Sequence, residues 1–274
     1  MAFSGWTRNS VFADLFYPGN PLQLKTTVER LLVREKEIKK TSFLLVPHAG
    51  YIYSGSVAGK TFACSDISKR VIVLGPNHTG FGRPISIWTK GFWKTPLGLL
   101  NIDEEISEEL INILGKECED KEGHLKEHSI EVEIPFLQVR YEKVDFVPIC
   151  VGTENYVELI ELGNAISEVV KKFENNVSII VSCDMNHYER AEINRVKDEA
   201  ALKAIEKLDS KELYEVVAEK NISMCGYAPC VASISALSKL GKWKVELVDY
   251  SHSGVLTNSD EEVVSYAGVR CFKE

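Results

Sequence analysis

The feature that most constrains this chain is a set of short apolar runs, each followed at once by a polar, chemically active side chain. Three such runs lie before these residues: 43–46 (FLLV) before His48, 71–74 (VIVL) before His78, and 177–182 (VSIIVS) before Asp184 and His187. Continuous runs rich in Val, Ile and Leu predict strands that are buried on both faces. The sequence therefore predicts a buried sheet with histidines at the carboxyl ends of its strands.

Between the apolar runs, most of the chain has apolar residues at the spacing of a helix. We expect helices over residues 21–39, 54–62, 103–114, 127–141, 156–173, 191–208, 211–219 and 226–241. Further strands are expected at residues 145–152, 244–251 and 265–272, with a strand and an aromatic-rich turn at 84–98. Strands that alternate with helices predict an α/β fold: a single domain over residues 1–274, with a central, largely parallel or mixed sheet flanked by helices.

The histidines at two of these strand ends form a matched pair. In open α/β sheets, ligands bind beyond the carboxyl ends of the strands. Neutral imidazole is a common metal ligand, and strands about 4.8 Å apart can direct two imidazoles at one ion. Alternatively, each histidine forms only a local hydrogen bond at the end of its strand. The occurrence of His48 and His78 in equivalent positions favours metal binding or catalysis.

The third run ends in SCDMNHYE, which holds two further candidates. A carboxylate such as Asp184 can fix the tautomer of a nearby imidazole, which leaves the other nitrogen of His187 free as an acid, a base or a ligand. The alternative is structural, because Asp184 or Asn186 can cap a helix that begins near Tyr188. Of these residues, His187 is the stronger candidate for a functional role.

Cysteines and a second histidine cluster supply the remaining candidates. Cys225 precedes Gly226 at the start of a predicted helix, where a thiol can become a thiolate ligand or nucleophile, whereas Cys230 falls within the apolar helix and is expected in the core. Roles as functional thiol and as small buried side chain are equally open for Cys225. In GHLKEHSIEVE, the zinc pattern H-E-x-x-H is absent. His128 or Glu131 can line the site, and a role in supporting it is the stronger expectation.

Composition excludes several classes of function. The net charge is −8 and no basic patch stands out, which argues against a nucleic-acid partner. No apolar run approaches the ~20 residues of a membrane span, and the first residues lack a secretory pattern. Phosphate-loop, dinucleotide and G-x-S-x-G motifs are also missing. Seven cysteines without disulfide-scaffold spacing suit a reducing compartment, so we expect a cytoplasmic protein with no membrane partner.

Six segments taken together resemble one known family. PHAGYIYSG, LGPNHTG, EHSIEVEIPFLQ, SCDMNHYE, MCGYAPC and SYAG resemble, in this order, the segments of the Memo family, and VFADLFYPG is similar to its opening segment. The resemblance extends from about residue 8 to residue 270. It implies the fold of the class III extradiol dioxygenases, which hold Fe(II) with two histidines and a carboxylate and use a further histidine as acid–base.

Carried onto this chain, the resemblance implies His48 and His78 as metal ligands, with Cys225 where the dioxygenases have their carboxylate. It also implies His187 as the acid–base residue, with Asp184 as its neighbour. A thiolate makes the site softer, so we expect Fe(II), with copper or zinc as alternatives. The expected protein is a metal-dependent redox enzyme.

The substrate expected for this enzyme is a small molecule or a peptide. For a microbial member, the resemblance also implies association with an AMMECR-like protein and a radical S-adenosylmethionine enzyme. Two other functions remain open. One is a non-catalytic metal- or peptide-binding protein, and the other is a zinc hydrolase in which His187 or Glu131 acts as the base.

Overall fold

The computed structural model describes residues 6–273. Its strands are β1 (Thr7–Asn9), β2 (Lys39–Val46), β3 (Ser65–Asp66), β4 (Arg70–Pro76), β5 (Ile85–Ile87), β6 (Phe92–Thr95), β7 (Gly98–Asn101), β8 (Asp145–Val151), β9 (Val177–Ser182), β10 (His187–Glu189), β11 (Lys244–His252) and β12 (Val263–Phe272).

The helices are α1 (Pro21–Leu31), α2 (Tyr51–Ala63), α3 (Glu104–Leu114), α4 (Glu122–Leu125), α5 (Ile134–Arg140), α6 (Tyr156–Lys172), α7 (Ala191–Glu206), α8 (Ser210–Glu219), α9 (Tyr227–Ser238) and α10 (Gly254–Thr257), with 3₁₀ turns at Lys116–Cys118 and Glu131–Glu133. Within residues 6–273, no helix combines the length and the apolar character needed to cross a membrane.

Most of the described strands form one large mixed sheet. Its order is β10-β12-β2-β9-β4-β8-β5, with β11 added to β12 and β3 to β2. The central strands β2, β9, β4 and β8 are parallel, whereas β12 and β5 join them antiparallel. A smaller sheet, β1-β6-β7, lies beside it. The expected α/β class and mixed sheet are therefore confirmed.

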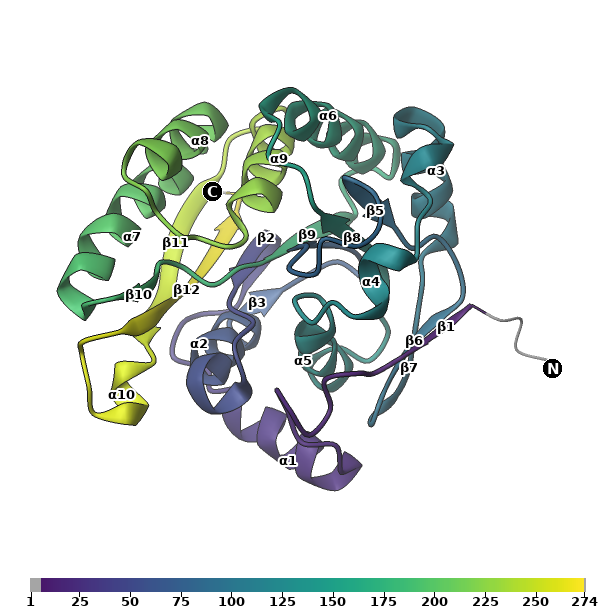
Figure 1. Cartoon of the computed structure of the whole chain (residues 1–274). Coiled ribbons are helices and arrows are strands. Elements are labelled where there is room, and N and C mark those ends of the chain that lie inside the picture. The colour runs from purple at the N-terminus through teal and green to yellow at the C-terminus, as the bar shows by residue number, and fades with distance from the viewer. Residues whose placement is uncertain (1–5, 274) are drawn as a thin grey trace.

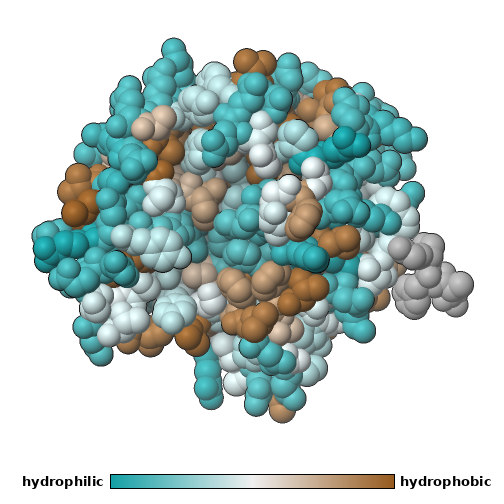
Figure 2. Space-filling view, in the orientation of Figure 1, coloured by the Kyte–Doolittle hydropathy of each residue, from teal (hydrophilic) through white to brown (hydrophobic). Residues whose placement is uncertain are grey.

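Helices cover both faces of the large sheet. Figure 1 shows α3, α6, α7, α8 and α9 on one face and α1, α2 and α5 on the other. On β2, Phe43 and Leu45 pack into the first layer, and Leu44 and Val46 pack into the second. Because both faces are buried, the strands carry continuous apolar runs instead of alternating with polar residues. The outer surface in Figure 2 is largely hydrophilic, with apolar groups gathered near the middle and lower part of this face.

The helix expected over residues 21–39 is wrong in its second half. It begins after the Asn20 cap, as its pattern indicates, but α1 ends at Leu31. The following segment is held by contacts with the far end of the chain: Lys36 donates to Glu246 at 2.9 Å, and Arg270 donates to the carbonyl oxygen of Glu37 at 2.8 Å. These tertiary contacts outweigh the weak local preference of a charged segment for helix.

The single helix expected over residues 127–141 is also wrong in its first half. Residues 127 and 128 have no regular structure, residues 129 and 130 form a turn, residues Glu131–Glu133 form a 3₁₀ turn, and α5 begins only at Ile134. Pro135 lies in the first turn of α5, where its missing N–H removes no helical hydrogen bond. The irregular turn before α5 carries His128, which matters for the site below.

A buried arginine ties the N-terminal segment to this irregular turn. Arg8 on β1 forms an ion pair with Glu131 (Nη1 to Oε2, 2.6 Å) and donates to the carbonyl oxygens of His124 and Glu127 at 2.7 and 2.6 Å. Its guanidinium also lies 4.2 Å from the ring centroid of Trp93. The donors of Arg8 are therefore engaged although the side chain is buried, which is the condition for a tolerable buried charge.

Glu131 is fully satisfied in turn. It accepts hydrogen bonds from the backbone N–H of Phe12 at 2.9 Å and from the hydroxyl of Tyr17 at 2.7 Å. The expectation that Glu131 supports the site therefore has a structural counterpart, because this carboxylate joins the 8–17 segment to the turn that carries His128.

We predict that Arg8→Met lowers the free energy of unfolding by roughly 3–5 kcal/mol, because it leaves the carboxylate of Glu131 buried without its cation. Urea denaturation measures this loss. The matched control is Lys25→Met, which removes an exposed cation paired with Glu29 at 3.8 Å and should change stability by less than about 0.5 kcal/mol. Equal effects of the two substitutions would contradict the prediction.

Candidate metal centre

Three histidines meet beyond the carboxyl ends of the central strands. His48 follows β2, His78 follows β4, and His128 lies in the turn before α5. Within the described part of the chain, one nitrogen from each ring lies within 4.8 Å of the others, an arrangement that can hold a metal ion. The sequence pairs His48 with His78, and the structure adds His128, which the sequence analysis expects to line the site or, more strongly, to support it.

His48 is oriented by a serine on the neighbouring strand. Its Nδ1 lies 2.8 Å from Oγ of Ser182, the last residue of β9. The single hydroxyl hydrogen of Ser182 is directed to the carbonyl oxygen of Ser129 at 2.6 Å, so Ser182 accepts from the Nδ1–H of His48. The Nε2 atom of His48 is thereby left unprotonated in the neutral ring, and it lies 3.3 Å from Sγ of Cys225.

One buried carboxylate orients the other two histidines. Glu127 accepts from the backbone N–H of His78 (2.6 Å), from its Nδ1 (2.9 Å) and from the backbone N–H of His128 (2.9 Å), and it lies 3.2 Å from Nδ1 of His128. Burial alone would raise the pKa of Glu127, but the hydrogen bond and charge of His78 bring it down to about 2. A carboxylate behind Nδ1 of a histidine directs Nε2 toward the ligand position, as is usual around protein-bound metals.

Cys225 provides sulfur at the same place. It lies two residues before the start of α9, and it accepts a hydrogen bond from the backbone N–H of Asp184 at 3.3 Å. Burial opposes ionisation, yet hydrogen bonding with Cys183 and the charge of His48 lower the pKa of the Cys225 thiol well below its usual value. Conversely, burial disfavours the cation of His48, but Cys225 and Asp184 raise its pKa to about 10. The two groups therefore stabilise a thiolate–imidazolium pair when no metal is bound.

Asp184 positions the backbone beside His48. Its Oδ1 accepts from the backbone N–H groups of His48 (2.9 Å) and Ala49 (3.3 Å), which joins the ends of β9 and β2. The alternative in which Asp184 or Asn186 caps a helix is wrong, because residues 187–189 form β10 and α7 begins only at Ala191. Asn186 instead holds Ser223 and Asn194 by side-chain hydrogen bonds.

The ring of His187 is fixed by backbone instead of by a carboxylate. Its Nδ1–H donates to the carbonyl oxygen of Ser223 at 2.8 Å, and its backbone N–H donates to the Ser223 hydroxyl at 2.8 Å. This bond leaves Nε2 as a hydrogen-bond acceptor. Ser223 lies two residues before Cys225, so the imidazole is attached to the segment that brings the thiol to the histidines.

A second buried carboxyl group lies behind His48. Glu133 is fully buried, its Oε1 lies 3.1 Å from Oγ of Ser182, and its Oε2 has no partner among the described residues. Burial raises the pKa of Glu133 to about 8, so it is protonated at neutral pH. Sequence reasoning gave no role to Glu133, Glu127 or Ser182. The available signal was their proximity in sequence to His128 and Asp184.

The donor set fits a borderline or soft metal. Imidazole nitrogens and a thiolate suit iron, copper and zinc, whereas magnesium and calcium prefer oxygen ligands. His124 does not join this set, since it is buried against Trp88 and Trp93, and its Nε2 lies 3.0 Å from the carbonyl oxygen of Ser86. Cys230 is fully buried in α9, as expected.

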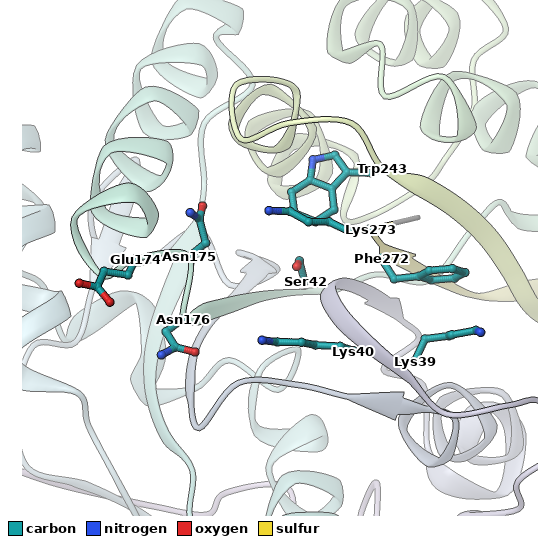
Figure 3. Close-up of a pocket in the computed structure, with 9 residues that line it drawn as sticks. All are labelled: Lys39, Lys40, Ser42, Glu174, Asn175, Asn176, Trp243, Phe272 and Lys273. Atoms are coloured by element: carbon teal, nitrogen blue, oxygen red, sulfur yellow. The ribbon is translucent and has the colours of Figure 1, made fainter.

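A pocket of about 430 Å³ lies elsewhere (Figure 3). Its lining includes Lys39, Lys40 and Asn176, which stand at or before the first residues of β2 and β9, together with Trp243 and Phe272. The candidate centre lies beyond the last residues of the same strands. This pocket is therefore separate from the histidines.

Comparison with known proteins agrees with the fold and the motifs. The sequence matches the family described as Memo-like protein over residues 8–270, and the chain belongs to that family. A MEMO1 family protein of Methanosarcina barkeri is 40% identical over 96% of this chain and 98% of its own length, and one of Aquifex aeolicus is 41% identical over the same shares. The family resemblance in the sequence is thus confirmed.

Among solved structures, the fold is similar to that of an uncharacterized protein from Escherichia coli K12. The two agree with a TM-score of 0.55 at 12% identity, covering 83% of this chain and 99% of the other. This likeness concerns the fold alone.

We predict that Glu127 makes the stability of the metal-free chain sensitive to acid. Its folded pKa of about 2 lies below the ordinary glutamate value of 4.5, so its contribution is present above pH 4.5 and is lost as the pH falls toward 2. The stability advantage of wild type over Glu127→Gln should shrink by roughly 2 kcal/mol between pH 7 and pH 3. Urea unfolding at the two pH values measures it.

Glu122→Gln is the matched control for this prediction, because Glu122 is exposed on the neighbouring α4. Its difference from wild type should stay constant across the same pH range. A constant difference for Glu127→Gln as well would show that the carboxylate is not held in its charged form.

Proposed function

We propose that this protein is a metal-dependent redox enzyme that holds one iron(II) ion with His48, His78 and Cys225. The observation that carries the proposal is the convergence of oriented donors. The Nδ1 atoms of both histidines are engaged, by Ser182 and by Glu127, and the thiol of Cys225 lies 3.3 Å from Nε2 of His48. This orientation requires several polar groups to be buried, and their desolvation is unfavourable. A core that binds no ligand would not need them.

His128 competes with Cys225 as third ligand. Its ring stacks on that of His78, with centroids 4.6 Å apart, and its Nδ1 also faces Glu127. Burial and the charge of His48 lower the pKa of His128 to about 3, so this ring is neutral and able to bind a metal. The proposal therefore includes a choice between two histidines with a thiolate and three histidines.

An iron(II) ion bound at this site supplies one-electron and dioxygen chemistry. The chain itself supplies a base and a way to hold it: Nε2 of His187 accepts a proton while the carbonyl oxygen of Ser223 keeps Nδ1–H in place. Asp184 keeps the loop of His48 against the end of β9. We further propose a fold relationship to the class III extradiol dioxygenases, which rests on the ordered motifs and the matching strand ends.

The metal content of protein purified without oxygen tests the ligand set. We expect close to one iron per chain in wild type and a loss of most of it in His48→Ala and His78→Ala. Cys225→Ala and His128→Ala are compared to identify the third ligand. The variant that loses iron is the one in which that ligand has been removed. His252→Ala is the control, because His252 ends β11 and its ring faces Asp260 at 4.0 Å instead of the centre. Metal retained in all variants would refute the assignment.

Dioxygen consumption by the iron-loaded protein tests the role of His187. With a panel of small aromatic diols and thiol-containing peptides, we expect uptake with at least one substrate, reduced roughly 10²–10⁴-fold in His187→Gln. Iron content should stay unchanged in that variant, and His252→Gln should retain full uptake. Uptake that is equal in wild type and His187→Gln would remove His187 from the reaction.

A zinc hydrolase is the second candidate, because three imidazoles are a donor set found in catalytic zinc sites. Stoichiometric zinc in place of iron, with ester hydrolysis and no dioxygen uptake, would favour it. A binding protein is favoured if metal is retained without turnover of any kind.

Association with an AMMECR-like protein and a radical S-adenosylmethionine enzyme remains part of the proposal, and co-purification from a native host tests it. A cytoplasmic location agrees with the seven free cysteines.

A further inference from the structure

Cys183 lies directly behind the candidate centre. Its sulfur is buried, yet it contacts polar backbone groups instead of apolar side chains alone. It follows β9, and its Sγ donates to the carbonyl oxygen of Asp184 at 3.0 Å. The backbone N–H of Gly226 donates to the same sulfur at 3.1 Å. The amide nitrogen of Gly226 is bonded to the carbonyl carbon of Cys225. The sulfur of Cys183 therefore contacts the peptide group that joins Cys225 to Gly226.

The sulfur of Cys225 shares this environment. It lies 3.6 Å from the same carbonyl oxygen of Asp184 that Sγ of Cys183 approaches at 3.0 Å, so both sulfurs converge on one atom. At Gly226, a Cβ atom would lie 2.5 Å from Cβ of Cys183, so the absence of a side chain there lets the two segments approach. Close backbone approach is what a disulfide needs, since its Cα atoms are about 4.4–6.8 Å apart.

The two cysteines differ in access. Over the part of the chain that the structure describes, Cys225 is the one cysteine that is partly exposed, and Cys183 is fully buried beside it. An oxidant from solvent therefore meets Cys225 first, and Cys183 is the thiol best placed to react with the product.

We propose that Cys183 and Cys225 form a reversible disulfide when a hydroperoxide reaches the site. The sulfur of Cys225 attacks the peroxide O–O bond, which yields a sulfenic acid on Cys225 and releases water from hydrogen peroxide or an alcohol from an organic hydroperoxide. The thiol of Cys183 then attacks the sulfenic sulfur, forms the S–S bond and releases the sulfenic oxygen as one molecule of water. The peroxide is reduced by two electrons, and the two thiols are oxidised.

The disulfide itself requires no metal, but its consequence rests on the proposed function. A sulfur bonded to Cys183 no longer offers a thiolate to the centre, so oxidation should weaken metal binding where Cys225 is a ligand. The disulfide also stops the oxidation of Cys225 before the irreversible sulfinic acid. The cysteine pair is thus a modification site. Its disulfide protects Cys225 from irreversible oxidation and removes its thiolate from the centre until it is reduced again.

The test is thiol mapping of the full chain after reduction and metal removal with a chelator. Hydrogen peroxide is added, free thiols are blocked with N-ethylmaleimide under denaturing conditions, and tryptic peptides are analysed without reduction. We expect blocked thiols to fall by two from the seven cysteines of the chain. Peptides 173–190 and 221–239 should be joined through Cys183 and Cys225, and dithiothreitol should separate them.

Variants make the test specific. Cys230→Ala is the matched control, because Cys230 shares peptide 221–239 and should leave the cross-link intact. In Cys183→Ala the cross-link is lost and Cys225 proceeds to sulfinic acid. Wild type in which Cys225 reaches sulfinic acid without any cross-link would overturn the proposal, and this result does not depend on the folding of a variant.

Metal titration separates this inference from the proposed function. Zinc binding that is lost on oxidation of wild type and recovered with dithiothreitol supports both the disulfide and Cys225 as a ligand. A mapped disulfide with unchanged zinc binding upholds the modification site and removes Cys225 from the ligand set, leaving the three histidines.

Discussion

The rest of the structure depends on the parallel register of the central strands. Leu45 of β2 and Leu74 of β4 both lie opposite Val181 of β9, so the three strands end at the same level. Apolar side chains on both faces lock this register, because a slip by one residue would exchange the two buried faces. The residues just beyond these strands therefore meet at one edge of the sheet, where the chain turns and polar side chains converge.

Buried acidic groups then convert this meeting point into an organised site. Glu127 holds His78 and the turn of His128, Asp184 holds the backbone of His48, and Ser182 connects the ring of His48 to Glu133. Each contact removes freedom from a ring that would otherwise sample several rotamers. Because the same turn is fixed from the other side by the Arg8–Glu131 ion pair, the N-terminal segment contributes to the geometry of the centre without entering it.

The sulfur of Cys225 belongs to two chemical systems at once. Toward His48 it is a potential metal ligand, and toward Cys183 it is one half of a potential disulfide. A carboxylate in this position would bind a metal without being open to oxidation. Under the proposed function, a thiolate ligand would couple metal binding to the redox state of the surroundings, and the proposed disulfide with Cys183 would make that coupling reversible.

Local pattern was sufficient for the α/β class, for most helices, and for the positions of His48, His78 and Asp184 just beyond strand ends, because buried strands and amphipathic helices have characteristic periodicities. His187 instead begins β10. Local pattern failed over residues 32–38 and 127–133, where long-range contacts hold the chain in conformations other than the predicted α-helix. Tertiary structure alone decided that His128 joins the other two histidines. It also decided that Glu127 orients His78 and Ser182 orients His48, because these partners lie 49 and 134 positions apart in the sequence. No periodicity records such partners, since each depends on how separate strands align.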